Sequence, residues 1–297
     1  MKTFPFCTEI PTVSRLPRWM ILDGALLPKL EFMVATLRRE LSTNIEYRPL
    51  LRNTRWSNVS DVGPYLVTWA KEIEEWAHET APYRYGVIFE SDACIADLET
   101  HWNKLIICQH SGLENDLTRL YDPIILHYLL TATEETRFES WMGPMKNLWL
   151  PNPFNQQYAE AKSCSETPQA LKEAVFTDEE WQSLSDATTA YTAWRLIQHI
   201  EEYFPDKLQA SKQETHAFVL QQLADLKQLG QVTEQCATYY LNIVCRLGNI
   251  LAENSLYPQI TACLRDVKVP LEQRLKHANQ LSVSLAQKPR DEVENYP

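Results

Sequence analysis

Hydrophobic and polar positions follow two different patterns along the chain. From about residue 19 to residue 150, short apolar runs rich in β-branched and aromatic residues alternate with stretches of helical period. Such runs are typical of strands, and their alternation with helices predicts an α/β region, which we expect to contain a mixed sheet. The expected strands are WMIL, YRPLL, YGVIFE, KLIICQ, LTRLY and MKNLWL.

Three of the expected helices in this region begin at a proline. They start at Pro28, Pro64 and Pro123, because proline at the first helical position loses no hydrogen bond and has a suitable φ. Asp122 stands directly before Pro123. A carboxylate at that position accepts hydrogen bonds from the free amides of the first turn, so we predict that Asp122 is an N-cap.

Beyond about residue 175 the apolar residues recur every three or four positions, which is typical of helices packed on one face. Thr177 with Glu180, and Ser211 with Glu214, match the capping box that opens a helix. We expect the last helix to start at Pro270.

These patterns predict two lobes with a boundary segment between them. Residues 1–150 form the α/β lobe, and residues 176–297 form an all-α helical lobe. Residues 151–175 are rich in Pro, Asn, Gln and Ser and are expected to be the boundary segment.

The charge balance excludes some classes of partner. The 28 basic and 39 acidic residues give a net charge of −11, which argues against nucleic-acid binding and favours a basic partner or an uncharged one. No apolar run is long enough to span a bilayer or to serve as a signal-peptide core. Seven cysteines at wide spacings indicate reduced thiols in a cytoplasm.

No phosphate-binding loop, nucleophile elbow, zinc-protease helix or Cys-x-x-Cys pair is present, and we expect no cofactor. The candidate metal ligands are Cys94, His101, Cys108 and His110. Cys94 and His101 are seven apart on an expected helix, and Cys108 and His110 are two apart on an expected strand, so each pair could share a face and hold zinc. Neither pair has the close spacing of a structural zinc site. Buried cysteines and histidines at element ends are the simpler interpretation.

A second candidate site consists of carboxylates. Asp23 and Asp92 each follow an expected strand, so they could gather with Asp122 at one edge of the sheet and perform acid–base chemistry. Alternatively, each aspartate caps a turn or a helix start.

Several of these motifs occur together in a known family. In order and spacing, WMILDGALLPKL, YRPLL, DVGPYLV, YGVIFES and LTRLYDPIIL with the following WMGPMKNLW resemble the type VI secretion effector adaptor (chaperone) family over roughly residues 18–150. The family pattern falls on Asp23, Gly24, Gly63, Pro64, Tyr65, Arg119, Tyr121, Asp122 and Pro123. The chain departs from the pattern at Ile124, where the family commonly has a second arginine.

The resemblance implies a cytoplasmic, non-catalytic adaptor. Such proteins bind a particular toxic effector and help to load it onto a spike protein of the valine-glycine repeat (VgrG) type, without contacting nucleic acid or membrane. The helical lobe, with the cleft between the lobes, would then supply a client-specific surface. The alternatives are a metal- or carboxylate-dependent hydrolase and an immunity protein that binds a toxin.

The resemblance also leaves an arginine to be explained. Because a buried charge needs a partner, we predict that Arg119 reaches across to the carboxylate of Asp23 while Asp122 caps the helix.

Overall fold

The computed structural model describes residues 2–11, 14–41, 44–110, 113–165, 171, 175–248, 250–251 and 256–287. The chain forms two compact units, Met1–Thr188 and Thr189–Pro297. Helix α6 (Asp178–Tyr203) begins in the first unit and ends in the second. No helix among the described residues is long and apolar enough to cross a membrane.

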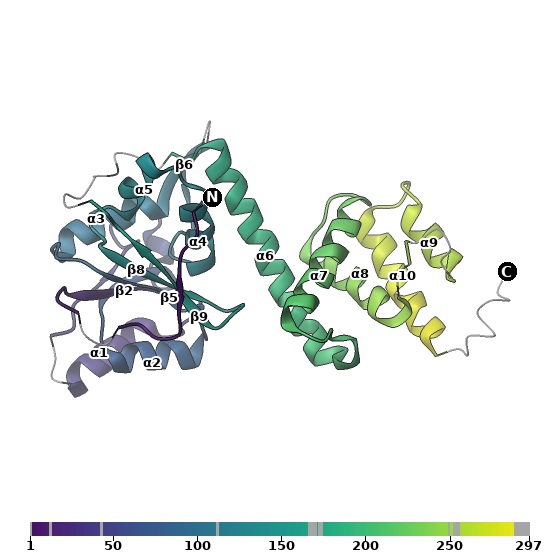
Figure 1. Cartoon of the computed structure of the whole chain (residues 1–297), viewed down its shortest axis with the longest axis horizontal. Coiled ribbons are helices and arrows are strands. Elements are labelled where there is room, and N and C mark those ends of the chain that lie inside the picture. Colours follow the sequence, from purple (N-terminus) through teal and green to yellow (C-terminus); the bar gives the residue numbers. More distant parts are fainter. Residues whose placement is uncertain are drawn as a thin grey trace. The chain divides into compact units, whose positions relative to one another are not determined.

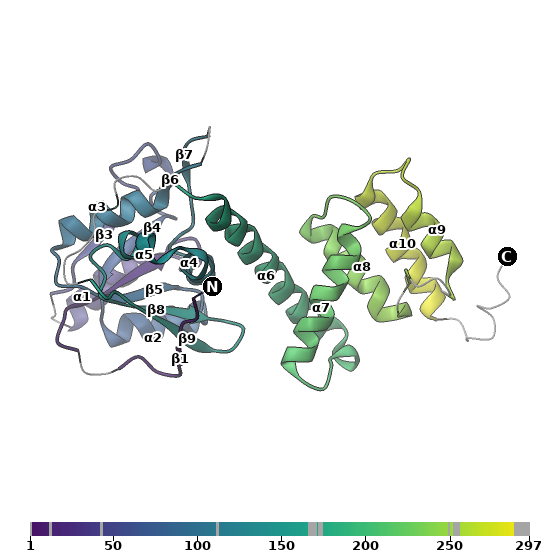
Figure 2. The same cartoon turned by 45° about the horizontal axis from the view of Figure 1, so that its top comes forward.

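The first unit is built on a seven-stranded sheet with the order β1-β9-β8-β5-β2-β4-β3. Its strands are β1 (Phe6–Cys7), β2 (Arg18–Asp23), β3 (Tyr47–Pro49), β4 (Pro64–Thr68), β5 (Gly86–Glu90), β8 (Asn147–Asn152) and β9 (Gln157–Lys162). Strands β6 (Ile107–His110) and β7 (Leu113–Leu117) form a separate antiparallel pair, which stands apart from the larger sheet in Figure 2.

The predicted order of an α/β lobe followed by an all-α lobe is confirmed, but the sheet is not mixed. Every strand pair that the structure describes is antiparallel. Helix α2 connects β4 to β5, and these two strands run parallel to each other. They are not neighbours in the sheet, because β2 lies between them and pairs antiparallel with both. Alternating strands and helices in a sequence do not show which strands pair.

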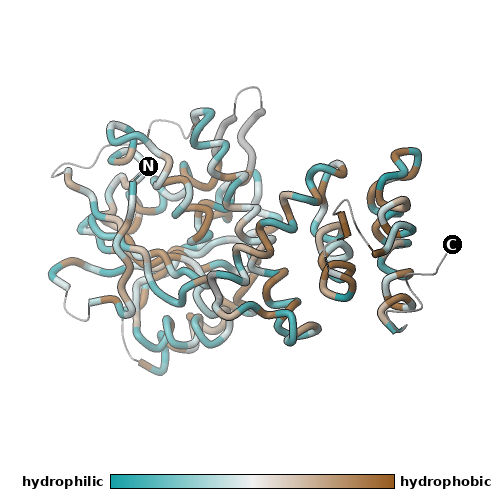
Figure 3. Tube along the Cα trace, turned by 45° about the vertical axis from the view of Figure 1, so that its right-hand side comes forward, coloured by the Kyte–Doolittle hydropathy of each residue, from teal (hydrophilic) through white to brown (hydrophobic). Residues whose placement is uncertain are grey.

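Helices cover both faces of the sheet (Figure 1). On one face lie α1 (Leu30–Leu41) and α2 (Lys71–Thr80), and on the other lie α3 (Ile95–Ile106), α4 (Pro123–Ala132) and α5 (Glu135–Met142). The central strand β2 serves both layers because its side chains alternate. Ile21 belongs to the core with α3, α4 and α5, and Met20 belongs to the core with α1 and α2. Figure 3 shows hydrophobic positions in the interior of the first unit and along the helices of the second.

Some predicted elements differ from the structure. Pro64 begins strand β4 and not a helix, since proline is also compatible with the first position of a strand. The segment LTRLY at residues 117–121 is largely a turn before α4. Residues 151–175 contain β9, which pairs with β8 inside the sheet. The polar composition of residues 151–175 therefore belongs to the β8–β9 hairpin and the sequence after it more than to a linker between the lobes.

In the described part of the second unit lie the end of α6 and the helices α7 (Lys212–Lys227), α8 (Glu234–Leu247), α9 (Pro258–Arg265) and α10 (Leu271–Ala286). Short 3-10 turns lie at Ser57–Val59 in the first unit and at Pro205–Lys207 in the second. The second unit has its own buried core, in which Tyr240 and Ile243 of α8 pack with Leu275 of α10. The last helix was predicted to start at Pro270; it begins at Leu271, and Pro270 is its N-cap.

Candidate functional site

The family motifs meet at a corner where β2 turns towards α1. Asp23 ends β2, and its backbone amide donates to the carbonyl of Tyr85 at 2.8 Å. Its Oδ1 accepts from the amide of Ala25 at 2.9 Å, and its side chain is only 1% exposed. A buried carboxylate with one oxygen committed to the turn needs a second partner for the other oxygen.

Arg119 is that partner. Its guanidinium donates to Oδ2 of Asp23, so the predicted ion pair is present. Burial disfavours the charge on Arg119, but Asp23, Tyr121 and Asp122 together outweigh this effect, and the pKa of the guanidinium is raised. The guanidinium also lies 5.8 Å from the ring centroid of Tyr121. The Arg119 side chain remains 44% exposed, so this corner presents a fixed cation at the surface.

Asp122 makes the second half of the motif. Its Oδ1 accepts from the amides of Ile124 at 3.0 Å and Ile125 at 3.3 Å, so the predicted N-cap of α4 is confirmed, with Pro123 in the first turn. Ile124 itself is 1% exposed. The position where the family commonly has a second arginine is therefore part of the apolar core in this chain, and Arg119 supplies the cation of the corner.

Two motif glycines allow the backbones to approach closely at this corner. The amide of Gly24 donates to the carbonyl of Gly63 at 3.1 Å, and a Cβ on Gly24 would lie 2.5 Å from that oxygen. A Cβ on Gly63 would lie 2.7 Å from a methyl carbon of Leu51. Pro64 follows, opposite Asp23 in the β2–β4 register. The Asp-Gly and Gly-Pro motifs are thus two sides of one contact.

The motif tyrosines lie on the buried sides of the corner. Burial raises the pKa of Tyr121 to about 12, and the Asp23 carboxylate adds to this effect. Burial likewise raises the pKa of Tyr65 to about 12. Both phenols therefore stay neutral at physiological pH and serve as packing groups rather than as bases.

The three predicted carboxylates do not all gather at one edge. Asp23 and Asp122 both act on the charge of Arg119, but Asp92 lies elsewhere because β2 and β5 are antiparallel. The register pairs Arg18 with Glu90, so Asp92 follows β5 at the end where β2 starts. Five residues of strand separate that end from Asp23, which corresponds to about 17 Å. The expectation that all three carboxylates share one edge is wrong.

Two of the four candidate metal ligands have other roles. Cys94 is exposed at the N-cap of α3, and its thiol lies 3.2 Å from Oδ2 of Asp97. His101 is buried, and its Nε2 lies 3.2 Å from the Trp141 carbonyl oxygen. Burial lowers the pKa of His101 to about 4. The side chains of Cys108 and His110, the other two candidates, lie outside the described residues; among the described ones, no group of three His, Cys, Asp or Glu is placed to hold a metal ion.

A third carboxylate, Glu180, organises the end of the first unit. It is 1% exposed and accepts from Thr133, from Trp141 Nε1 at 3.0 Å and from two nitrogens of Arg137 at 3.1 and 2.9 Å. It also accepts from the amide of Thr177, which completes the predicted capping box of α6. The box predicted for Ser211 and Glu214 is present as well. The sequence showed the cap of α6 but not its link to α4 and α5.

A buried polar row on the opposite face of the sheet was not predicted. Arg18 and Glu90 face each other across β2 and β5 and form an ion pair at 3.1 Å, with both side chains 7% exposed. Asn147 on β8 donates to the same carboxylate at 2.6 Å. The only sequence signal was a charge at each of two strand ends next to apolar runs.

Comparison with known proteins adds to this geometry. Residues 18–139 match the family described as "Domain of unknown function (DUF4123)". A curated relative, "Accessory protein VasW" of Vibrio cholerae serotype O1, is 24% identical over 281 residues, which cover 94% of this chain and 91% of the relative. No solved structure matches the chain.

The resemblance to the type VI secretion effector adaptor family is thereby confirmed over residues 18–139, since this domain is associated with such adaptors. The matched stretch includes the whole Asp23–Arg119 corner. These findings support an adaptor-type role associated with type VI secretion.

Proposed function

We propose that the protein is a cytoplasmic, non-catalytic adaptor that binds one secreted toxin effector and helps to load it onto a VgrG-type spike protein. The observation that carries the proposal is the adaptor-associated domain at residues 18–139, within a chain that aligns with an accessory protein over 94% of its length. The loading step is one of binding and release, so no bond of the client is changed.

The chemistry of the motif corner is consistent with a scaffold. Asp23 and Asp122, the carboxylates of the corner, hold an arginine and a helix N-terminus. Groups with these partners are poorly suited to transfer protons. Arg119, which is half-exposed, remains available to a partner on its open side.

We further propose that the second unit supplies the client-specific surface. Several large apolar side chains are exposed there, in contrast to the buried core beneath them. They are Tyr203, Leu208, Leu220, Leu256, Val267 and Val283. The proposal assigns these side chains to contacts with the client.

An affinity pull-down from the bacterium that encodes the protein tests the proposal. The tagged chain is captured, washed at moderate salt, and everything retained is identified by mass spectrometry. We expect one large effector together with a spike protein. Recovery of the chain alone, with both partners shown to be expressed, would refute the adaptor function. Protection of a toxin-sensitive neighbour by this gene alone would favour an immunity protein instead.

A further inference from the structure

A cavity of about 710 Å³ lies on the face of the sheet that α1 and α2 cover. It opens between the segment after β1, helix α2 and strand β9, and one of its walls is aromatic. His78 packs edge-on against Tyr83 with ring centroids 4.6 Å apart, and Tyr83 lies 5.9 Å from Tyr158. Trp69 completes this wall. The cavity lies away from the Asp23–Arg119 corner, whose residues do not line it.

The cavity is acidic as well as aromatic. Four glutamates line it, Glu9, Glu74, Glu75 and Glu79, together with two cations, Arg18 and Lys71. Both cations are already paired with a carboxylate. Arg18 is bound to the buried Glu90 at 3.1 Å, and Lys71 is bound to Glu75 at 3.4 Å. The remaining carboxylates give the opening an excess of negative charge.

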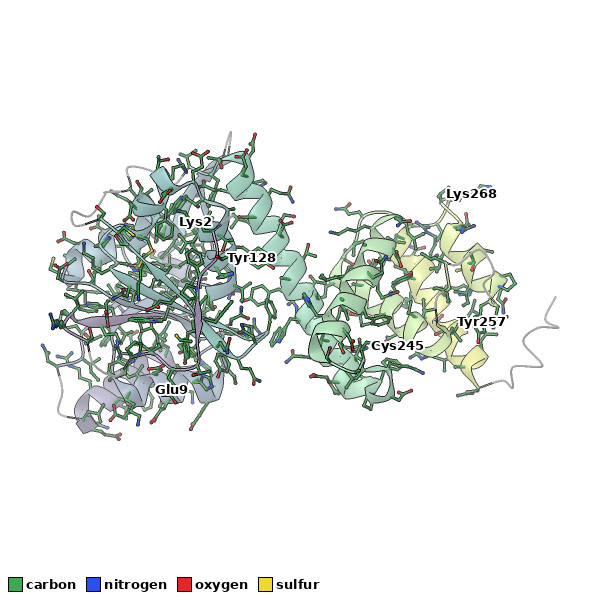
Figure 4. The ribbon with its side chains drawn as sticks, viewed as in Figure 1. Lys2, Glu9, Tyr128, Cys245, Tyr257 and Lys268 are labelled. Carbon is green, nitrogen blue, oxygen red and sulfur yellow. The ribbon has the colours of Figure 1, made fainter. Side chains whose placement is uncertain are left out.

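Glu74 is the carboxylate deepest in the wall. It accepts from Trp69 Nε1 at 2.6 Å and from the Tyr158 hydroxyl at 3.4 Å. Both donors are neutral, so they orient the carboxylate without cancelling its charge. Glu9 and Glu79 are exposed near the entrance, and Figure 4 shows Glu9 on the same side of the unit as α2.

We propose that this cavity binds a lysine or arginine side chain on an extended segment of a protein partner. Aromatic faces attract cations, and a cation over such a ring gains further from a nearby carboxylate. The volume exceeds that of one side chain, so neighbouring backbone of the segment fits beside α2. The chain as a whole has a net charge of −11, which favours encounter with a basic segment. The inference rests on the proposed function only for the identity of the protein that bears the segment.

A peptide titration tests the recognition chemistry directly. The probes are two capped pentapeptides, Gly-Gly-Lys-Gly-Gly and the same peptide with Gln in place of Lys, added to the full chain. Binding is followed by the indole N–H resonance of Trp69, assigned with a Trp69→Phe variant. We expect a saturable shift with the lysine peptide and none with the glutamine peptide.

Two double variants with the same change in net charge provide the control. Glu9→Lys with Glu79→Lys places two cations at the entrance, and we expect the affinity for the lysine peptide to fall about tenfold. Glu201→Lys with Glu272→Lys changes two exposed glutamates of the second unit, and we expect a change of less than about twofold. An equal loss in both double variants, or equal shifts with both peptides, would overturn the proposal.

The same variants in the pull-down separate this inference from the proposed function. If the wild-type chain retains an effector and a spike protein and the Glu9→Lys, Glu79→Lys variant loses one of them, that partner bears the segment. If the variant retains both, the cavity is not their recognition site and the inference fails while the adaptor function stands. If the wild-type chain retains neither, the adaptor function fails, and the titration alone decides on the cavity.

Discussion

Replacement of Arg119 by Met would leave the Asp23 carboxylate buried without its cation. Removal of one partner from a fully buried ion pair costs about 3–5 kcal/mol. Here Asp23 is 1% exposed and Arg119 is 44% exposed, so water reaches the vacated side, and Ala25 still donates to Oδ1 of Asp23. We therefore expect a smaller loss in the free energy of unfolding, about 2 kcal/mol.

The reverse replacement should cost less. Asp23→Asn leaves the charge on the half-exposed Arg119, where water can solvate it, and we expect a loss of about 1 kcal/mol. Because the two side chains contact each other, the double variant should be about 1 kcal/mol more stable than the sum of the single losses predicts. The order of the two single losses follows from the difference in exposure between the partners.

Urea unfolding of the full chain, followed by circular dichroism at constant pH and salt, measures these differences. Arg52→Met is the matched control, because Arg52 pairs with Glu31 at 3.1 Å with both side chains exposed, and we expect a change below about 0.5 kcal/mol. Equal effects of Arg119→Met and Arg52→Met would refute the structural role of the pair. Unchanged stability together with loss of the client in a pull-down would place Arg119 at an interface.

Three further predictions concern the first unit. Glu180→Gln removes the charge that Arg137 contacts. Thermal melting should show a loss of about 2–3 kcal/mol in the free energy of unfolding, with little change in the helix content of the second unit. Burial lowers the pKa of His101 to about 4, from an ordinary value of 6.5. The free energy of unfolding therefore keeps its full value above pH 6.5 and falls as the pH declines from 6.5 towards 4, by about 3 kcal/mol in total. A His101→Gln variant should lose this part of the pH dependence in urea titrations. Gly24→Ala forces a methyl group against the carbonyl of Gly63. The fraction of soluble, cooperatively folding protein should fall, and the free energy of unfolding should drop by about 2 kcal/mol. Wild-type stability of this variant would contradict the close contact.

Local chemistry predicted more of the candidate site than of the sheet. The N-cap at Asp122 depends on the residues that directly follow it, and the Arg119–Asp23 pair follows from the need of a buried charge for a partner. Strand direction and neighbourhood depend on contacts between distant segments, so the position of β2 between β4 and β5 was not predicted. For the same reason Pro64, which fits a helix start or a strand start equally well by itself, was assigned to the wrong element.

The aromatic, acidic cavity was also beyond reach of the sequence. Its residues come from the N-terminal segment, from β2, from α2 and the residues beside it, and from β9, and Tyr158 is separated from Glu74 by 84 positions. No periodicity connects such residues, because only the fold brings them together.

The position of Glu180 has a consequence for recombination between related genes. Its helix opens the all-α part of the sequence, yet the four residues that donate to its carboxylate, Thr133, Arg137, Trp141 and Thr177, all belong to the first unit. A crossover that exchanged C-terminal parts at the visible change of composition near residue 175 would separate Glu180 from Thr133, Arg137 and Trp141. Exchange of client specificity should therefore succeed most often at a junction within α6, after Thr188, where each parent retains an intact core.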